Sequence, residues 1–314
     1  MALAILCSGQ GRQHARMFAL TEAAPEAAAL FSHAAVLLGG RDPRELVRNE
    51  ADDILHQNRV GQILCTLQAL AATAMLGDAL PARRIVAGYS IGELAAWGVA
   101  GASSHTDTLD LSARRAEIMD MVSMPGDGML FVRGLADADV GNLCEMHGAA
   151  IAIVNPGNSF VIGGSRAALD LIAQAAKAGG ATRVASLPIE VASHTPRLAR
   201  ASPAFREALR LMDITLPPIT TARLLSGIDG TAVESIDEGL DKLAAQISRT
   251  VRWADCLQSC VEAGATAFLE LGPGSALADM AAGAYGAFPA RSLEEFRTVA
   301  GARAWLAKCV DSPS

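Results

Sequence analysis

The stretch Ala87-Gly88-Tyr89-Ser90-Ile91-Gly92-Glu93-Leu94 follows a short apolar run, Arg84-Ile85-Val86, and leads into apolar residues that recur at helical spacing as far as Val99. Its centre, Gly-x-Ser-x-Gly, is typical of a sharp strand-to-helix turn that exposes a serine hydroxyl and directs the next backbone N–H toward an oxyanion. Small residues flank such a serine because the turn is crowded. The stretch therefore predicts Ser90 as a nucleophile; the alternative is a plain glycine-lined turn.

A serine nucleophile needs a base, and His194 is the best placed of the six histidines. It occupies a short polar loop, Ser193-His194-Thr195-Pro196, between a predicted strand and a helix that starts at proline. His14 is the nearest rival, because the other four lie in or beside helical patterns with polar neighbours. No acidic residue between Ser90 and His194 stands out as a third triad member, so backbone carbonyls are the alternative means of orienting the base.

Outward from the serine, the pattern indicates an α/β protein. Residues 2–7 form an apolar run that ends in a glycine turn and predicts a buried strand, and 59–76 and 106–121 have the spacing of helices. Later elements are expected at the following positions: a helix at 196–212, a β-rich stretch through 225, helices at 237–248 and 255–264, and a strand at 267–271.

The pattern of predicted strands and helices changes in the middle part of the chain. The sequence pattern of residues 128–188 predicts the β-α-β-β-α-β order of a ferredoxin-like module, with helices at 137–147 and 166–178. We therefore expect a small inserted subdomain at 128–188 and a larger α/β subdomain built from 1–127 and 189–314.

Composition narrows the class of protein. A chain of 314 residues with 51% hydrophobic residues can bury a large core and is not of the disordered class. The net charge of −7, with no basic block longer than a pair, predicts no binding to nucleic acid or to a membrane surface. The apolar N-terminal stretch is too short for a signal peptide, and no later window offers about 18 uninterrupted apolar residues, so we expect a cytoplasmic protein. The six cysteines include no C-x-x-C pair, which predicts structural thiols and no metal site.

Five motifs occur in one order along the chain and together resemble the malonyl-CoA:acyl carrier protein transacylase family. They are Gly9-Gln10-Gly11-x-Gln13, Gly88-x-Ser90-x-Gly92-Glu93, an arginine about 25 residues later, Val191-Ala192-Ser193-His194, and Glu270-x-Gly272-Pro273-Gly274. Within that family the stretches 6–11 and 88–97 look most like the malonyl transferase subunit of malonate decarboxylase. The resemblance implies an α/β fold with a larger α/β-hydrolase-like subdomain and an inserted small ferredoxin-like subdomain.

The resemblance also implies the roles of five residues. Ser90 would accept the malonyl group from malonyl-CoA, and His194 would take its proton and later activate the acceptor thiol, in a ping-pong cycle. The backbone N–H groups of Gln10 and Ile91 would bind the oxyanion. Arg115 would bind the free malonyl carboxylate in a bidentate pair, while its neighbour Arg114 points about 100° away around the helix. Without the resemblance, Arg115 would be taken for a solvated cation.

Further residues follow from the resemblance at family positions near the substrate: Gln62, Asn155, Asn158 and Arg252. Arg252 stands in Val251-Arg252-Trp253, where the family often has Val-Gln-Trp, an element whose backbone helps to orient the histidine. Tyr89 stands where relatives more often have histidine, and it would shape the pocket or pack on the small subdomain.

The resemblance implies no bound cofactor. The acceptor would be an acyl carrier protein bearing a phosphopantetheine-type arm, and other malonate decarboxylase subunits would be further partners. Because carrier proteins are usually acidic, docking would need basic residues near the site; the candidates are the pairs Arg12 with Arg16 and Arg197 with Arg200.

Three alternatives remain open from the sequence. A serine hydrolase would share the nucleophile and the base, but it has no reason to place a cation at the end of the acyl group. A scaffold subunit without activity would have no chemical need for Ser90, His194 and Arg115 together. A malonyl transferase of fatty acid or polyketide synthesis differs only in the carrier that it serves.

Overall fold

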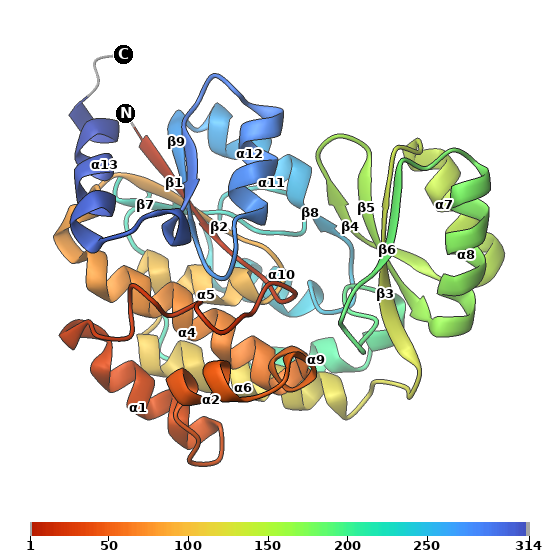
Figure 1. The fold of residues 1–314 in the computed structure, drawn as a ribbon, viewed down its shortest axis with the longest axis horizontal. Helices are drawn as coiled ribbons and strands as arrows, with labels where there is room; N and C mark the ends of the chain where they lie inside the picture. Colours follow the sequence, from red (N-terminus) through yellow and green to blue (C-terminus); the bar gives the residue numbers. More distant parts are fainter. Residues whose placement is uncertain (1, 312–314) are drawn as a thin grey trace.

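The computed structural model of the protein describes residues 2–311, which contain two five-stranded sheets that lie side by side (Figure 1). The larger sheet is parallel, with strand order β10-β9-β1-β2-β7. Its strands are β1 (Ala2–Cys7), β2 (Arg84–Gly88), β7 (Ala222–Leu224), β9 (Ala265–Leu271) and β10 (Ala290–Ser292). Because β1 lies at the centre between β9 and β2, the carboxyl ends of three strands meet at one edge of this sheet.

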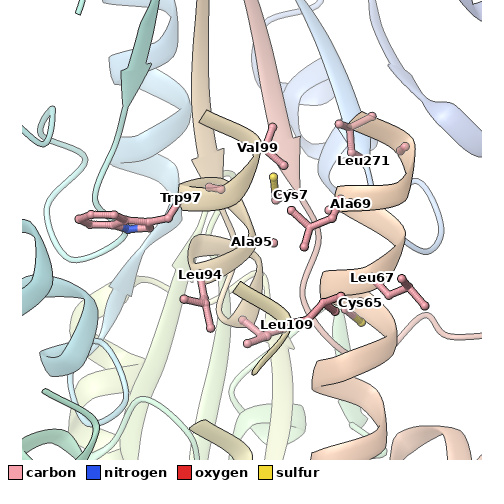
Figure 2. Close-up of a cluster of buried hydrophobic side chains, with 14 of the residues drawn as sticks. Cys7, Cys65, Leu67, Ala69, Leu94, Ala95, Trp97, Val99, Leu109 and Leu271 are labelled. Carbon is pink, nitrogen blue, oxygen red and sulfur yellow. The ribbon is translucent and has the colours of Figure 1, made fainter. Parts of the chain in front are cut away.

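Helices cover both faces of the larger sheet. Alternate residues of β1 face opposite layers: Cys7 packs into one apolar core, and Leu6 packs into a second. Figure 2 shows Cys7 of β1 near Ala69 of α4 and Ala95 of α5. The helices that flank the sheet are α4 (Asn58–Leu76), α5 (Ile91–Ala100), α6 (His105–Asp120), α9 (Ala201–Leu209), α10 (Ile236–Ala245), α11 (Trp253–Glu262), α12 (Ala276–Ala284) and α13 (Val299–Asp311).

The apolar residues of α4 pack in this core. Within the described part of the chain, the segment 58–79 is the one helix long and apolar enough to cross a membrane, and 83% of its most apolar window is buried inside the protein. Its apolar residues are therefore accounted for by packing against α5, α6 and the sheet.

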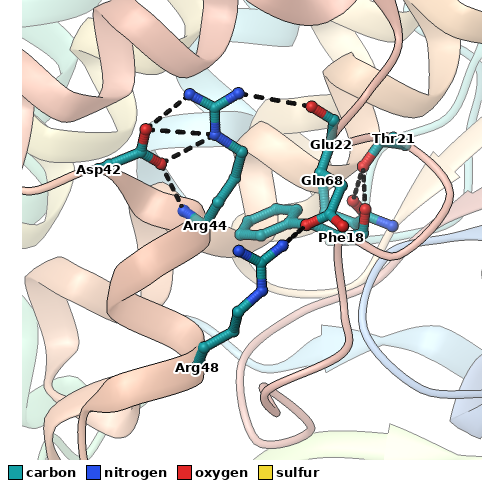
Figure 3. Close-up of polar contacts among 7 residues, drawn as sticks. All are labelled: Phe18, Thr21, Glu22, Asp42, Arg44, Arg48 and Gln68. Carbon is teal, nitrogen blue, oxygen red and sulfur yellow. Dashed lines mark hydrogen bonds and ion pairs between the residues drawn. The ribbon is translucent and has the colours of Figure 1, made fainter.

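Three helices that the sequence pattern did not predict follow the first strand: α1 (Ala28–Leu37), α2 (Pro43–Asn49) and α3 (Asp52–His56). Polar contacts anchor this segment, as Figure 3 shows. Asp42 caps α2 by accepting from the Arg44 backbone N–H at 2.8 Å, and its carboxylate also binds the Arg44 guanidinium at 2.6 Å. Arg48 of the same helix pairs with Glu22.

The smaller sheet has strand order β6-β3-β5-β4-β8 and is antiparallel except for the β4–β8 pair. Its elements are β3 (Asp127–Arg133), α7 (Asp137–His147), β4 (Ala150–Asn155), β5 (Ser159–Ser165), α8 (Arg166–Ala178), β6 (Arg183–Ser186) and β8 (Val251–Arg252). Helices α7 and α8 cover one face and form a core with it (Figure 1). The predicted fold class, a larger α/β part with a smaller ferredoxin-like part, is thus confirmed. The division at 128–188 stays a prediction, and β8 joins the smaller sheet from outside that range.

The region after His194 differs from the sequence prediction. The predicted helix at 196–212 is a short 3-10 turn, η3 (Pro196–Leu198), followed by the separate helix α9. Pro203 explains the break, because proline lacks an N–H and is tolerated only in the first turn of a helix. The predicted β-rich stretch contains only β7, since Pro217 and Pro218 cannot donate to a strand ladder. The remaining 3-10 turns are η1 (Pro25–Ala27), η2 (Gly77–Ala79) and η4 (Leu293–Glu295).

Candidate active site

Ser90 lies in the tight turn between β2 and α5, as the sequence predicts. Its backbone adopts φ 58° and ψ −121°, a conformation that residues with side chains rarely take and that often marks functional sites. The two glycines of the motif are needed for space: a Cβ at Gly88 would lie 2.0 Å from the Gly92 carbonyl oxygen, and one at Gly92 would lie 2.0 Å from the Cys7 carbonyl oxygen. The turn can therefore approach β1 closely only with glycine at both positions.

His194 contacts the serine. Its Nε2 lies 2.7 Å from Ser90 Oγ, and its Nδ1 lies 2.6 Å from the backbone carbonyl oxygen of Gln246. Because a carbonyl can only accept, Nδ1 carries the proton and Nε2 is left to accept from the serine hydroxyl. Burial, together with the nearby charge of Arg115, lowers the pKa of His194 to about 3. The imidazole is therefore neutral at pH 7, which is the form that acts as a base.

The other candidate for the base does not approach the serine. His14 lies 2.9 Å from a Glu294 carboxylate oxygen, and its side chain is 43% exposed. The contact with Glu294 raises its pKa. His14 is accordingly a surface ion-pair residue in this fold.

Gln246 was missed by the sequence analysis and connects the whole site. Its Nε2 donates to the Ser90 carbonyl oxygen at 2.9 Å and to a Glu93 carboxylate oxygen at 2.7 Å, and its Oε1 accepts from Arg115 at 3.0 Å. The side chain is fully buried. A glutamine beside the apolar residues Ala244 and Ile247 was the only hint in the sequence, since buried amides need several partners.

The expectation for Arg252 is wrong. We expected the backbone around Arg252 to orient the histidine, but the carbonyl in contact with His194 belongs to Gln246. Arg252 lies exposed on β8, where its guanidinium binds Asp255 at 2.8 Å. The residue stabilises the surface next to α11 and does not face the serine.

Arg115 is almost completely buried, with 1% of its surface exposed, while Arg114 lies on the surface beside Glu117. Only Arg115 of the two neighbouring arginines is therefore buried. The Arg115 guanidinium donates to two neutral amide oxygens, Gln62 Oε1 at 2.8 Å and Gln246 Oε1 at 3.0 Å. Burial lowers its pKa to about 10, so it stays charged near neutral pH.

The buried guanidinium of Arg115 has no anionic partner in direct contact among the described residues. Among residues 2–311 no carboxylate lies within ion-pair distance of it. Glu93 acts on it through Gln246, and burial raises the pKa of Glu93 to about 7. A buried guanidinium with only neutral direct partners favours a carboxylate ligand.

A cavity of about 730 Å³ lies between the two sheets and reaches Ser90 and His194. Its walls come from the loop after β1, the serine turn, α12 and the open face of the smaller sheet. Asn155 lines this cavity, but Arg115 and Gln62 lie behind its wall. The expectation for Asn158 is wrong: its side chain is exposed in the turn between β4 and β5, where its backbone carbonyl accepts from Gly134.

The sequence pattern of the acyl transferase domain matches residues 5–296. This chain belongs to the acyl transferase family. The chain is 31% identical over 304 residues to the malonyl CoA-acyl carrier protein transacylase of Mycobacterium tuberculosis H37Rv, a match that covers 93% of this chain and 96% of that protein. It is 30% identical over 283 residues to polyketide synthase GfsB of Streptomyces halstedii, which covers 88% of this chain but only 5% of that much longer protein.

Solved structures show the same architecture. The crystal structure of an acyl-carrier-protein S-malonyltransferase from Burkholderia pseudomallei 1710b superposes with a TM-score of 0.88 at 28% identity, and the match covers 97% of this chain and all of that one. The protein is thus an enzyme of acyl transfer with the fold expected from its sequence.

In this acyl transferase two backbone N–H groups near the serine have no acceptor. Within the described residues, neither the Gln10 nor the Ile91 N–H makes a hydrogen bond, and Gln10 lines the cavity. Two contacts of Ser8 fix the loop that holds Gln10. Ser8 Oγ donates to Glu270 at 2.6 Å. Ser8 also packs so closely against Gly272 that a Cβ there would lie 2.4 Å from it. Unpaired donors on a fixed loop fit the expected oxyanion site.

Glu270 ties this loop to α12. Its second carboxylate oxygen accepts from the backbone N–H groups of Leu277 and Ala278 at 3.0 and 2.8 Å, at the first turn of that helix. Burial nevertheless raises the pKa of Glu270 to about 7. Glu270 was recognised from its motif, but its bond to Ser8 was not predicted.

Two other expectations concern neighbours of the site. The Tyr89 ring packs edge-on against Trp253 at 5.4 Å and lines the cavity, as the pocket-shaping hypothesis requires. Arg197, a candidate for carrier docking, instead binds the buried carboxylate of Asp127 at 2.5 and 3.1 Å. The structure describes six cysteines without a disulfide, and no cluster of metal-ligating side chains occurs in the part of the chain that it covers.

Proposed function

We propose that this acyl transferase moves a malonyl group from malonyl-CoA to the thiol of an acyl carrier protein through a malonyl ester on Ser90. Ser90 Oγ attacks the thioester carbonyl while His194 Nε2 takes the hydroxyl proton, and His194 then gives this proton to the departing coenzyme A thiolate. In the second half, the carrier thiol loses its proton to His194 and attacks the ester, and Ser90 recovers the proton. The N–H groups of Gln10 and Ile91 stabilise the oxyanion in both halves.

The observation that carries this proposal is the buried, charged Arg115 next to a paired serine and histidine. The malonyl carboxylate supplies the anion that Arg115 lacks, and Gln62 and Gln246 hold the guanidinium in position to receive it. Arg115 would reach the carboxylate when the acyl group occupies the inner end of the cavity. No cofactor takes part.

The site belongs, in this proposal, to a cleft between a larger subdomain, residues 1–127 and 189–314, and a smaller subdomain, residues 128–188. Such a cleft keeps water away from the ester until the acceptor thiol arrives, which distinguishes a transferase from a hydrolase. The reaction takes place in the cytoplasm, where its substrate and carrier protein are found.

Two carriers are candidates for the acceptor. The motif around Tyr89 supports a role in priming the carrier subunit of malonate decarboxylase. The match along 96% of a malonyl CoA-acyl carrier protein transacylase supports a role in fatty acid or polyketide synthesis. The carriers differ in their arms, because the decarboxylase carrier has a dephospho-coenzyme-A-type arm with an extra phosphoribosyl unit.

A transfer assay with an Arg115 variant tests the proposal. The malonyl-enzyme is mixed with each of the two carriers and with buffer alone, and transfer is followed by the mass of the carrier. Arg115→Gln should reduce malonyl transfer by roughly 100-fold, the value of a lost charge-assisted pair of about 3 kcal/mol, and should reduce acetyl transfer much less. Equal losses for malonyl and acetyl would remove Arg115 from carboxylate recognition, and release of malonate with neither carrier acylated would identify a hydrolase.

A further inference from the structure

The loop that carries His194 has a strained backbone. His194 adopts φ 60°, a region that residues with side chains rarely occupy and that persists only where the surrounding structure holds it. The segment after α10 supplies two of the contacts that hold it. The His194 N–H donates to the Ile247 carbonyl oxygen at 2.8 Å, and Nδ1 donates to the Gln246 carbonyl oxygen at 2.6 Å.

The smaller sheet contacts the same loop. A Cβ at Gly163 of β5 would lie 2.7 Å from Thr195 Cγ2, so the backbone of this strand packs directly on the residue that follows the base. Thr195 is fully buried. Its Oγ1 donates to the Ala192 carbonyl oxygen at 2.7 Å and accepts from the Arg197 N–H at 3.3 Å. These bonds close the loop into one turn, which links Arg197 to the base.

Arg197 joins this turn to the start of β3 by an ion pair. Its Nη2 lies 2.5 Å from Asp127 Oδ1 and its Nε lies 3.1 Å from Asp127 Oδ2, a two-point contact that fixes the orientation of both groups. The side chain of Asp127 is 1% exposed, and that of Arg197 is 34% exposed. Within residues 2–311 Asp127 has no second ion-pair partner, and its contact with Arg197 raises the pKa of the guanidinium.

Asp127 lies where the chain enters the smaller sheet. It is the first residue of β3 and pairs with Ser165, the last residue of β5. The carbonyl oxygen of the preceding Gly126 accepts from the N–H of Arg166, the first residue of α8, at 2.7 Å. The Asp127 carboxylate therefore has a fixed place in the smaller part of the fold, although a buried carboxylate is costly unless it is paired.

We infer that Arg197 is a positioning residue for the base, because its ion pair with Asp127 couples the loop of His194 to the smaller sheet. The pair keeps Nε2 at its 2.7 Å contact with the hydroxyl of Ser90. This inference rests on the proposed function, in which His194 is the base. Since Arg197 does not line the cavity, its loss should lower kcat and leave KM nearly unchanged.

Acylation of Ser90 with and without the base separates positioning from stability. Arg197→Met is made in the wild type and in His194→Ala, and each protein is measured by rapid quench at a temperature where circular dichroism shows it folded. We expect Arg197→Met to lower kcat with malonyl-CoA by roughly 10-fold, because the base is displaced, and to change KM less than about 2-fold. In the His194→Ala background it should change the residual rate less than about 2-fold, because there is no base left to position.

An alkyl fluorophosphonate reports on the base without malonyl-CoA. Ser90 Oγ attacks the phosphorus, fluoride leaves, and His194 takes the hydroxyl proton. Arg197→Met should slow this reaction by the same factor as acylation by malonyl-CoA. Arg210→Met removes an exposed arginine from its surface pair with Glu207 and should change neither rate.

A double variant keeps the test if Arg197→Met fails to fold. Asp127→Asn/Arg197→Met removes both charges, so that no buried charge is left alone. We expect it to lose kcat by the same factor of about 10 and to keep KM, as the single variant does.

The outcomes separate the inference from the proposed function. Equal losses with and without His194, or a folded double variant with the kcat of the wild type, assign the ion pair to stability alone and overturn the inference. A loss with malonyl-CoA but not with the fluorophosphonate places Arg197 at the substrate and overturns it as well. A wild type that reacts with the fluorophosphonate but not with malonyl-CoA overturns the proposed function, while the fluorophosphonate rates still test the positioning of His194; a wild type that reacts with neither overturns both.

Discussion

The inner and outer parts of the cavity differ in how their polar groups are satisfied. At the inner end, His194 lines the cavity while Gln246 and Arg115 lie behind its wall, and all three are buried and bonded to other protein groups. On the outer wall, Arg133 and Arg183 are exposed without carboxylate partners. The comparison teaches that folding fixes the geometry of the reacting groups in advance, whereas charged groups of the outer wall are left without carboxylate partners.

Loss of the base should have the largest effect at the inner end. His194→Ala leaves Ser90 without a proton acceptor, so acylation by malonyl-CoA should slow by roughly 10²- to 10⁴-fold, measured by rapid quench. His14→Ala removes a histidine that binds Glu294 and should change the rate less than 2-fold. A larger loss in the His14 variant than in the His194 variant would reverse our assignment of the base.

Loss of the connecting amide should have the next largest effect. Gln246→Met keeps the backbone carbonyl that binds His194 but removes one buried hydrogen-bond partner from Glu93 and one from Arg115. We expect the free energy of unfolding to fall by about 2–4 kcal/mol in urea titrations. Gln258→Met, on the exposed face of α11, should have almost no effect.

A kinetic measurement separates positioning by Gln246 from mere stability. Because Gln246 holds Arg115, the Met variant should lose more activity with malonyl-CoA than with acetyl-CoA at a temperature where it is fully folded. Equal losses with both substrates count against a positioning role.

A smaller effect is expected at the loop that carries Gln10. The pKa of Glu270 is raised to about 7 in the folded protein, so its stability contribution is present below its unfolded value near 4.5 and is lost as the pH rises through 7. Glu270→Gln should therefore gain about 1–3 kcal/mol relative to the wild type between pH 5 and pH 8, measured by urea unfolding. Glu145→Gln on the surface of α7 should leave the pH dependence of the wild type unchanged, and a Glu270 variant with that same dependence argues against a buried carboxylate.

Elements with a strong local signal were predicted well from the sequence. The glycines around Ser90 allow the tight strand-to-helix turn that the motif predicts. Residues 137–147 and 166–178 form helices with the predicted bounds. Helix α1 was missed because its apolar residues surround it on nearly every side and give no periodic pattern. The prediction of one helix at 196–212 failed because it ignored Pro203.

Residues of the site that act through their side chains could be predicted from the sequence, and residues that act through their backbone atoms were harder to predict. Ser90, His194 and Arg115 carry their chemistry in their side chains; sequence motifs placed Ser90 and His194, and the resemblance to the family placed Arg115. The carbonyl that orients His194 could belong to any residue, so the sequence pointed to the segment at Arg252 when the structure uses Gln246. Asn158 was chosen because the resemblance places its segment at the edge of the cleft, but it is exposed and does not line the cavity.

The central claim, a malonyl ester on Ser90, is tested most directly by intact-protein mass spectrometry after mixing the enzyme with malonyl-CoA. The account predicts one added malonyl group on the wild type, located on Ser90 by peptide mapping, and none on Ser90→Ala. Consumption of malonyl-CoA without an adduct, or an adduct that persists in Ser90→Ala, would contradict it.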